Sequence, residues 1–294
     1  MRITAGAVAF AVAAGGGLVA FVAFTGGKAK PSPSPAASAS TSPTPTPAPS
    51  YSPGTGKQTG TVKPEPAPST VACGAKAPPG AGKPKPQFNG PPPLTIDPSK
   101  TYIATMATSC GTIKIKLLAD QAPITVNSFV FLAEHHYFDG QYFHRLDTSI
   151  DVVQGGDPVG TGTGGPGYSI PDELQPGASY TPGTLAMANG GPNTGGSQFF
   201  LITGPKGTNL DQNPAYAIFG TVIAGLDVAQ RIQQLPIKDP QAVAQGDLSG
   251  QQPKDAVYID EVTITVKGPS ESPTPSTSPT PKKSKKPKPS PSAS

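Results

Sequence analysis

An arginine followed at short intervals by amide and aromatic side chains is the part of this sequence best suited to chemistry. Arg145 ends the segment Phe143-His144-Arg145, which precedes Gln154-Gly155-Gly156-Asp157 and the run Met-Ala-Asn-Gly-Gly-Pro-Asn-Thr-Gly-Gly-Ser-Gln-Phe-Phe at 187–200. A guanidinium stays charged at physiological pH and donates hydrogen bonds in a fixed planar pattern. An isolated arginine would more often be a surface ion-pair residue. The residues around Arg145 favour a functional role instead.

These segments, in this order and near this spacing, resemble the active-site signature of the cyclophilins, the peptidyl-prolyl cis/trans isomerases. The resemblance covers roughly residues 97 to 267. It implies a fold dominated by β-structure, a closed eight-stranded antiparallel β-barrel capped by two α-helices. It also implies an enzyme that accelerates rotation about X-Pro peptide bonds. Because that rotation breaks no covalent bond, we expect neither a cofactor nor a metal.

The resemblance also assigns roles to single residues. Arg145 matches the catalytic arginine, Gln154 the glutamine that orients it, and Phe200 an aromatic residue of the proline pocket. The substrate-binding set implied in the same way is His144, Val152, Ala188, Asn189, Gln198, Leu210 and Tyr216. Val152 and Leu210 could equally be barrel core, and His144 could be structural.

The chain departs from the family pattern beside Arg145 and again at Asn209. Eight residues separate Arg145 from Gln154, one more than is usual. Asp151 then falls where a pocket phenylalanine is common, unless the extra residue lets Asp151 turn outward and Ile150 fill the pocket. Asn209 stands where cyclosporin-sensitive members carry tryptophan, so we expect weak sensitivity to that drug.

The elements that must position these residues can be predicted from periodicity. Alternation of apolar and polar residues predicts a β-hairpin over 102–108 and 111–117. Helical spacing predicts one amphipathic helix over 122–137, with Pro123 near its start, and a second over 226–235. Short strand-like runs are predicted at 141–145, 152–154, 184–187, 198–203, 217–223 and 257–266.

Proline usage indicates one globular domain with long flanks. Of 39 prolines among 294 residues, only 13 fall within 97–268. We therefore divide the chain into a membrane anchor or signal segment (1–27), a Pro/Ser/Thr-rich linker (28–72), a Pro/Gly-rich lead-in (73–96), the isomerase-like domain (97–268) and a Lys/Pro/Ser-rich disordered tail (269–294). The linker and the tail are too poor in large apolar residues to offset the entropy of ordering them.

Charge is divided between the domain and its flanks. Residues 97–268 carry 9 Lys and Arg against 16 Asp and Glu, a net charge of −7, while the flanks carry +11. An acidic domain repels phosphate, so we expect no nucleic-acid partner. The basic tail could be simply solvated, or it could contact anionic cell-wall polymer or lipid headgroups.

The apolar run from Ile3 to Phe24 is long enough to cross a hydrocarbon core of roughly 30 Å. We favour an uncleaved anchor with the domain outside the cytoplasm, and secretion after signal cleavage is the alternative. The linker would then act as an extended spacer, as through a cell wall.

The two cysteines, Cys73 and Cys110, predict one disulfide in an exported chain, whereas two free thiols would be expected in the cytosol. Their spacing offers no zinc site of the usual kind.

The sequence therefore predicts a monomeric peptidyl-prolyl isomerase that acts on proline-containing polypeptides outside a membrane and assists their folding. The rival interpretation is a binding module: the same barrel used as a receptor for proline peptides or as a wall-associated chaperone, with catalysis weakened by Asp151.

Overall fold

The computed structural model describes residues 51–269. The predicted anchor at 1–27, the linker as far as residue 50 and the tail from residue 270 lie outside this range. No helix within residues 51–269 is long and apolar enough to span a membrane.

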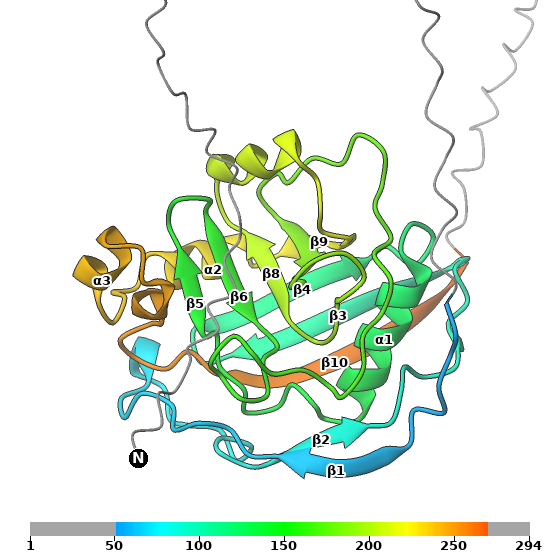
Figure 1. Cartoon of the computed structure of the whole chain (residues 1–294), viewed down its shortest axis with the longest axis horizontal. Coiled ribbons are helices and arrows are strands. Elements are labelled where there is room, and N and C mark those ends of the chain that lie inside the picture. Colours follow the sequence, from blue (N-terminus) through cyan, green and yellow to red (C-terminus); the bar gives the residue numbers. More distant parts are fainter. Residues whose placement is uncertain (1–50, 270–294) are drawn as a thin grey trace, which may run out of the picture.

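The main body is one antiparallel sheet of eight strands, shown in Figure 1. The strands are β3 (Lys100–Thr108), β4 (Gly111–Leu117), β5 (Arg145–Asp147), β6 (Val152–Gly155), β7 (Thr184–Met187), β8 (Phe199–Ile202), β9 (Ile218–Ala224) and β10 (Ile259–Pro269). Their order across the sheet is β10-β3-β4-β9-β7-β8-β6-β5. The predicted hairpin is confirmed as β3 and β4, because Tyr102 pairs with Leu117 and Thr108 with Gly111.

The two edge strands, β5 and β10, do not pair with each other in a ladder. Instead, the segment just before β5 bonds to the start of β10: the Gly140 N–H donates to the Ile259 carbonyl at 2.7 Å, and the Phe143 N–H to the Val257 carbonyl at 3.0 Å. The strand predicted over 141–145 makes only the single bridge Tyr142–Tyr258, and β5 begins at Arg145. The eight antiparallel strands expected from the sequence are present, but β5 and β10 form no continuous ladder, and these bonds and this bridge link the two edges in place of a closed barrel.

Both predicted helices are present, as α1 (Pro123–Glu134) and α2 (Leu226–Gln233). Pro123 opens α1, where a missing N–H costs nothing. The next two N–H groups, of Ile124 and Thr125, donate to the Glu173 carboxylate at 3.0 and 2.8 Å. A short helix that was not predicted from the sequence, α3 (Pro240–Ala244), lies between α2 and β10 along the chain. The structure also contains three 3₁₀ helices: η1 (Ala72–Gly74), η2 (Pro205–Gln212) and η3 (Leu248–Gln251).

The core lies between α1 and the inner face of the curled sheet. Phe129 of α1 stacks on Phe138 with ring centroids 4.9 Å apart and meets Phe219 of β9 at 5.4 Å. All three rings are almost fully buried. These contacts fix α1 against β9 and keep the sheet curved around a filled interior.

The folded part of the chain starts earlier than the sequence predicted. Residues 51–72, assigned to the linker, contain β1 (Gln58–Val62), which pairs antiparallel with β2 (Lys85–Phe88) of the lead-in. Figure 1 shows this two-stranded ribbon outside the main sheet. Phe88 is buried against Phe131 of α1, with ring centroids 4.9 Å apart. The boundary at residue 72 was therefore wrong, because a proline-rich segment is held here by contacts with the domain.

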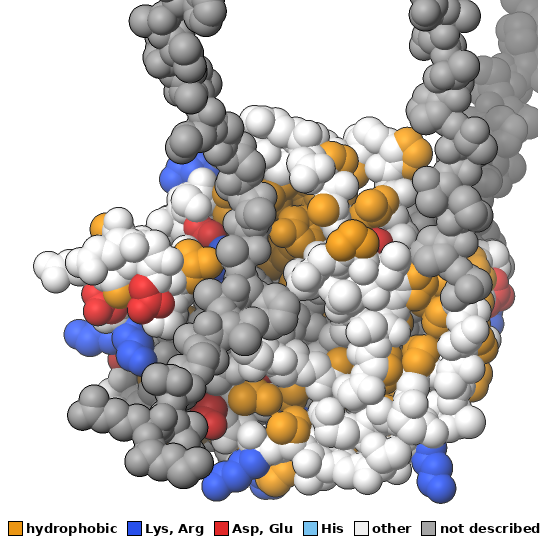
Figure 2. Space-filling model, viewed as in Figure 1, with side chains coloured by type: hydrophobic (Ala, Val, Ile, Leu, Met, Phe, Trp, Pro, Cys, Tyr) orange, Lys and Arg blue, Asp and Glu red, His pale blue; other side chains and the backbone are white. Residues whose placement is uncertain are grey.

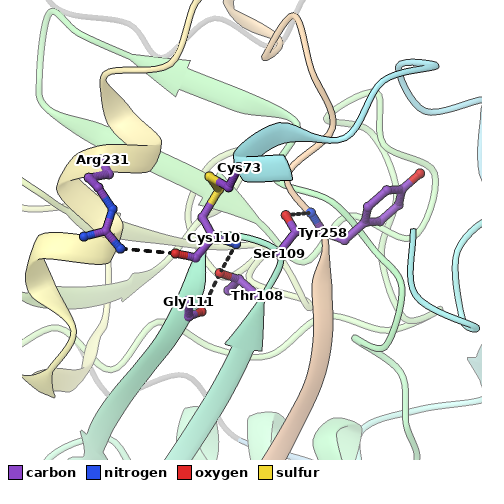
Figure 3. Close-up of a disulfide and its surroundings, with 7 residues drawn as sticks. All are labelled: Cys73, Thr108, Ser109, Cys110, Gly111, Arg231 and Tyr258. Atoms are coloured by element: carbon purple, nitrogen blue, oxygen red, sulfur yellow. Dashed lines mark hydrogen bonds between the residues drawn. A yellow bond between two sulfur atoms is a disulfide. The ribbon is translucent and has the colours of Figure 1, made fainter. Parts of the chain in front are cut away.

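A disulfide joins Cys73 to Cys110, with their Cα atoms 5.2 Å apart (Figure 3). Cys110 lies in the turn between β3 and β4, and its carbonyl accepts a hydrogen bond from Arg231 of α2 at 3.2 Å. The bridge therefore ties the lead-in to the hairpin next to α2.

Candidate active site

Pairing of three short strands brings the main predicted residues together. Arg145 of β5 is opposite Gln154 of β6, and Gln154 is opposite Phe200 of β8. Paired residues on adjacent strands point to the same face of a sheet. The guanidinium, the amide and the aromatic ring therefore lie side by side.

Next to these residues is a pocket of about 50 Å³. It is lined by Arg145, Ile150, Val152, Gln154, Ala188, Asn189, Phe200, Leu210 and Tyr216. Figure 2 shows apolar side chains around a recess in the upper part of the molecule, near the helical segment that carries Leu210. Every one of these residues except Ile150 was assigned to the site from the sequence.

The floor and walls of the pocket are apolar and aromatic. Phe200 and Val152 are buried, and the Tyr216 ring meets the Phe200 ring edge to face at a centroid distance of 5.2 Å. The Tyr180 hydroxyl donates to the Tyr216 carbonyl at 2.8 Å and holds that residue in place. Burial raises the pKa of Tyr216, against the smaller opposing effect of Arg145, so its hydroxyl is neutral at physiological pH. The surface presented is suited to a small apolar ring.

The polar side of the pocket is a chain of hydrogen bonds. Nη1 of Arg145 donates to Oε1 of Gln154 at 3.0 Å, and Nε2 of Gln154 donates to Oε1 of Gln198 at 3.0 Å. Nε2 of Gln198 in turn donates to the carbonyls of Gly162 and Gly164, at 3.0 and 2.9 Å. The orientation of Gln154, and through it the guanidinium, is therefore fixed from the neighbouring glycine-rich loop.

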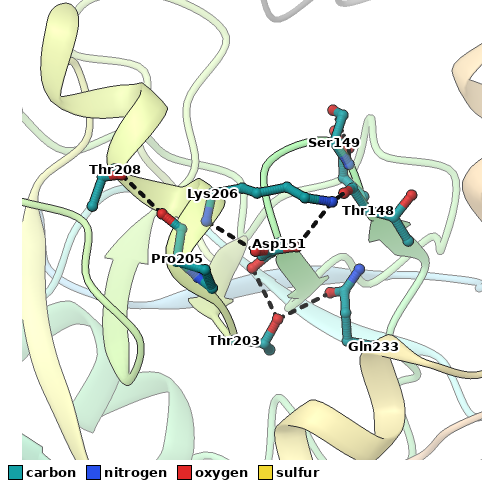
Figure 4. Close-up of polar contacts among 9 residues, drawn as sticks. Thr148, Ser149, Asp151, Thr203, Pro205, Lys206, Thr208 and Gln233 are labelled. Carbon is teal, nitrogen blue, oxygen red and sulfur yellow. Dashed lines mark hydrogen bonds and ion pairs between the residues drawn. The ribbon is translucent and has the colours of Figure 1, made fainter.

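The loop between β5 and β6 places Ile150 in the pocket lining, whereas Asp151 does not line the pocket. Figure 4 shows Asp151 among its polar partners, which include Thr203 and Lys206. The Asp151 carboxylate accepts from the backbone N–H of Lys206 at 2.9 Å and lies 3.7 Å from the Lys206 ammonium. The Asp151 carbonyl accepts from Thr203 N–H at 2.9 Å. Asp151 also has φ of 51°, a left-handed conformation that aspartate tolerates better than most residues. The expected outward turn of Asp151, with Ile150 taking the pocket position, is confirmed.

The two glycines after Gln154 are needed for close packing. A Cβ on Gly155 would lie 2.9 Å from the Phe143 ring. Gly156 has φ of 81°, and a Cβ there would lie 2.2 Å from the Ser197 carbonyl oxygen. This explains why glycine occupies both positions after the orienting glutamine.

Two residues assigned to substrate binding, His144 and Gln198, do not line the pocket. His144, the residue before β5, does not line the pocket: it is buried, and neither ring nitrogen has a partner among residues 51–269. Burial lowers the pKa of His144 to about 4. Gln198 reaches the site only through Gln154. Asn189 does line the pocket, but its side-chain nitrogen already donates to the carboxylate of Asp172 at 3.2 Å and the carbonyl of Ala215 at 2.8 Å.

Two further residues contact Arg145 and were missed from the sequence. Asp147 pairs with Nη2, and Gln251 accepts from Nε at 2.7 Å. Asp147 could have been found, because residues two apart on a strand share a face. Gln251 gave no such signal, since it lies 106 residues from Arg145.

A larger hollow of about 280 Å³ lies away from this site, between the lead-in and the residues before β5. Its lining includes Pro64, Pro66, Lys85, Tyr142 and Tyr258, and none of the predicted site residues. We assign the chemistry to the smaller pocket because only there do a guanidinium and an apolar wall meet. Within the described part of the chain, no group of three or more His, Cys, Asp or Glu side chains could hold a metal ion.

Comparison with known proteins identifies the family of the chain. Residues 103–264 match the family model described as "Cyclophilin type peptidyl-prolyl cis-trans isomerase/CLD". Peptidyl-prolyl cis-trans isomerase A of Mycobacterium tuberculosis is 39% identical over 189 residues, which cover 58% of this chain and 97% of the relative. Peptidyl-prolyl cis-trans isomerase B of Streptomyces anulatus is 42% identical over 151 residues, covering 45% of this chain and 84% of the relative.

Among solved structures, a cyclophilin-type isomerase from Cryptosporidium parvum is 30% identical, with a TM-score of 0.49, and the match covers 56% of this chain and 98% of that one. The family model alone spans more than half of the 294 residues. The chain belongs to the cyclophilin-type peptidyl-prolyl cis-trans isomerases.

Proposed function

We propose that this isomerase lowers the barrier to X-Pro rotation through Arg145, with the proline ring held in the pocket beside it. The observation that carries the proposal is the guanidinium held at the rim of an apolar pocket, with its side chain only 15% exposed. A charged donor in a largely dry site interacts more strongly than the same donor in water.

The chemistry required is the weakening of one partial double bond. Resonance gives the peptide C–N bond a rotational barrier of about 18–20 kcal/mol. A donor directed at the prolyl nitrogen favours the pyramidal form in which that resonance is lost. Preorganised donors of this kind contribute roughly 3–4 kcal/mol to a transition state. Arg145 would act as the electrostatic catalyst, and Gln154 would orient it.

Binding of the proline ring is assigned to Phe200, Val152, Ile150, Leu210 and Tyr216. A pocket with these walls excludes water and holds the ring while the preceding residue rotates. Asn189 and Ala188, at the other side of the pocket, are placed to contact the peptide backbone. Their contribution would be to binding, and so to KM.

We further propose that the substrates are exported or cell-surface proteins and that the domain acts outside the cytoplasm. The apolar segment 1–27 and the spacer after it support export, and the Cys73–Cys110 disulfide supports an oxidising compartment. We also propose that the N-terminal segment anchors the protein in a membrane and that the basic tail contacts anionic polymer or lipid. Unaided X-Pro isomerisation takes tens to hundreds of seconds, so a nearby isomerase would shorten folding.

The binding-module alternative depended on Asp151 weakening the pocket. Since Asp151 pairs with Lys206 outside the pocket, no observation now favours that alternative over catalysis.

Two assays test the proposed function. A protease-coupled isomerisation assay on a Xaa-Pro peptide should give a kcat/KM far above the uncatalysed rate. Refolding of a protein limited by proline isomerisation should accelerate in proportion to added enzyme. Peptide binding without any acceleration would favour the receptor over the enzyme. For the location, a reporter that matures only outside the cytoplasm, fused after residue 269, should be active in cells.

A further inference from the structure

The guanidinium of Arg145 is held by three partners rather than by Gln154 alone. Nε donates to Gln251, Nη1 to Gln154, and Nη2 to Asp147. Arginine has five N–H donors, so these bonds leave two for a substrate. The orientation of the free donors is therefore set by where the three acceptors stand.

Asp147 is itself fixed in place. Its Oδ1 accepts from the backbone N–H of Ser149 at 2.9 Å and from the Ser149 hydroxyl at 2.6 Å. Its Oδ2 is left to pair with Nη2 of Arg145, and only 6% of the side chain is exposed. With so little water around it, the carboxylate is an anchor for the guanidinium and has little freedom to move.

Gln251 approaches from an independent segment between α2 and β10. Gln251 is the last residue of η3, and its side chain is buried. The start of η3 is capped by the Asp247 carboxylate, which accepts a hydrogen bond from the Ser249 N–H at 2.9 Å. Gly250 packs so closely that a Cβ there would lie 2.3 Å from the Asp239 carbonyl oxygen. This segment therefore holds the Gln251 amide in a defined position against Nε.

We propose that Asp147 and Gln251 are positioning residues that hold Arg145 in its productive orientation. The proposal rests on the catalytic role of Arg145 proposed above. A long, flexible side chain loses rotamer entropy when it is fixed, and neighbours that fix it beforehand remove this cost from the reaction. Displacement of a catalytic group by about 1 Å can cost on the order of a hundredfold in rate.

The expected effects fall on kcat, because neither residue lines the pocket. Asp147→Ala removes the acceptor for Nη2 of Arg145 and should lower kcat about tenfold. Asp147→Asn keeps an oxygen acceptor, so its kcat should be about threefold higher than that of Asp147→Ala. Gln251→Met keeps the length of the side chain without its acceptor and should lower kcat about threefold. KM should change less than twofold in all three. Gln252→Met is the matched control, because the Gln252 amide donates to the Tyr142 hydroxyl at 3.3 Å, away from the pocket. The kcat of the Gln252→Met variant should equal that of the wild type.

The decisive test is a double-mutant cycle with Arg145→Ala, with folding checked by thermal unfolding. If Asp147 and Gln251 act through Arg145, then Asp147→Asn and Gln251→Met should cost nothing further in the Arg145→Ala background. The Arg145 Nε–H signal in NMR spectra should also shift or broaden in folded Gln251→Met. Equal losses in both backgrounds, or wild-type kcat in both single variants, would overturn the positioning role while leaving the role of Arg145 intact. Full activity of Arg145→Ala would instead refute the proposed catalyst itself, and the positioning role with it.

Discussion

Replacement of Ile150 by alanine should weaken catalysis, whereas a change at its neighbour Asp151 should not. β5 and β6 pair from Arg145–Gln154 to Asp147–Val152, and the connecting loop then places Ile150 against the pocket cluster. Asp151 is held outside by Thr203 and Lys206. The extra residue in this loop therefore supplies a pocket wall rather than a buried charge.

The size of the effect follows from the apolar surface that is lost. Ile150→Ala removes three carbon atoms, worth about 2.4 kcal/mol if fully buried at about 0.8 kcal/mol each. Because Ile150 is half-buried, we expect about half of this, or about 1.2 kcal/mol, which corresponds to about a sevenfold loss. The loss should be seen in kcat/KM for a Xaa-Pro peptide at substrate concentrations well below KM.

Asp151→Asn is the matched control for this prediction. Asparagine tolerates positive φ and keeps an acceptor for the Lys206 N–H, while the ion pair it removes involves an ammonium whose side chain is 57% exposed and is worth little. Its kcat/KM should stay within about twofold of the wild type. A change of more than fivefold in Asp151→Asn, with Ile150→Ala nearly unaffected, would show that the loop is placed wrongly.

Two further predictions concern stability. Cys73→Ser opens a covalent loop with a sequence separation of 37 residues and should lower the free energy of unfolding by about 4 kcal/mol in the chain-entropy model, without loss of kcat/KM. Urea unfolding measures this, and equal stability of the bridged protein and the variant would contradict it. Burial lowers the pKa of His144 from 6.5 to about 4, so between these pH values the unfolded chain binds a proton that the folded chain does not. The free energy of unfolding should therefore fall by about 3 kcal/mol through His144 as the pH drops from 7 to 4. The fall should be less steep in His144→Gln, and the same dependence of the unfolding free energy on pH in both proteins would refute the assignment to His144.

Local patterns were sufficient to predict the regular parts of the fold. The hairpin 100–117 follows from alternation and the helix from Pro123 follows from helical spacing, and both patterns are set by the few residues involved. The ribbon of β1 and β2 could not be predicted in this way. Its two strands contain few large apolar residues, and they are held by Phe88 against α1 and by the disulfide.

The site was predictable where the family motif is continuous and less so elsewhere. Strand alternation around Arg145 predicts that His144 faces away from it, so the role of His144 as a substrate contact could have been rejected from the sequence. The same alternation puts Asp147 beside Arg145. Gln251 depends on how the segment between α2 and β10 folds back, and no local pattern encodes that contact.

The measurement that tests the central claim most directly is kcat/KM of folded Arg145→Ala for a Xaa-Pro peptide, beside the wild type. Loss of an electrostatic donor worth roughly 3–4 kcal/mol predicts a fall of one to three orders of magnitude. Thermal unfolding must show that the variant is folded, because the change leaves the Asp147 carboxylate buried without its partner. A kcat/KM within about threefold of the wild type in folded protein would contradict the assignment of Arg145 as the catalyst.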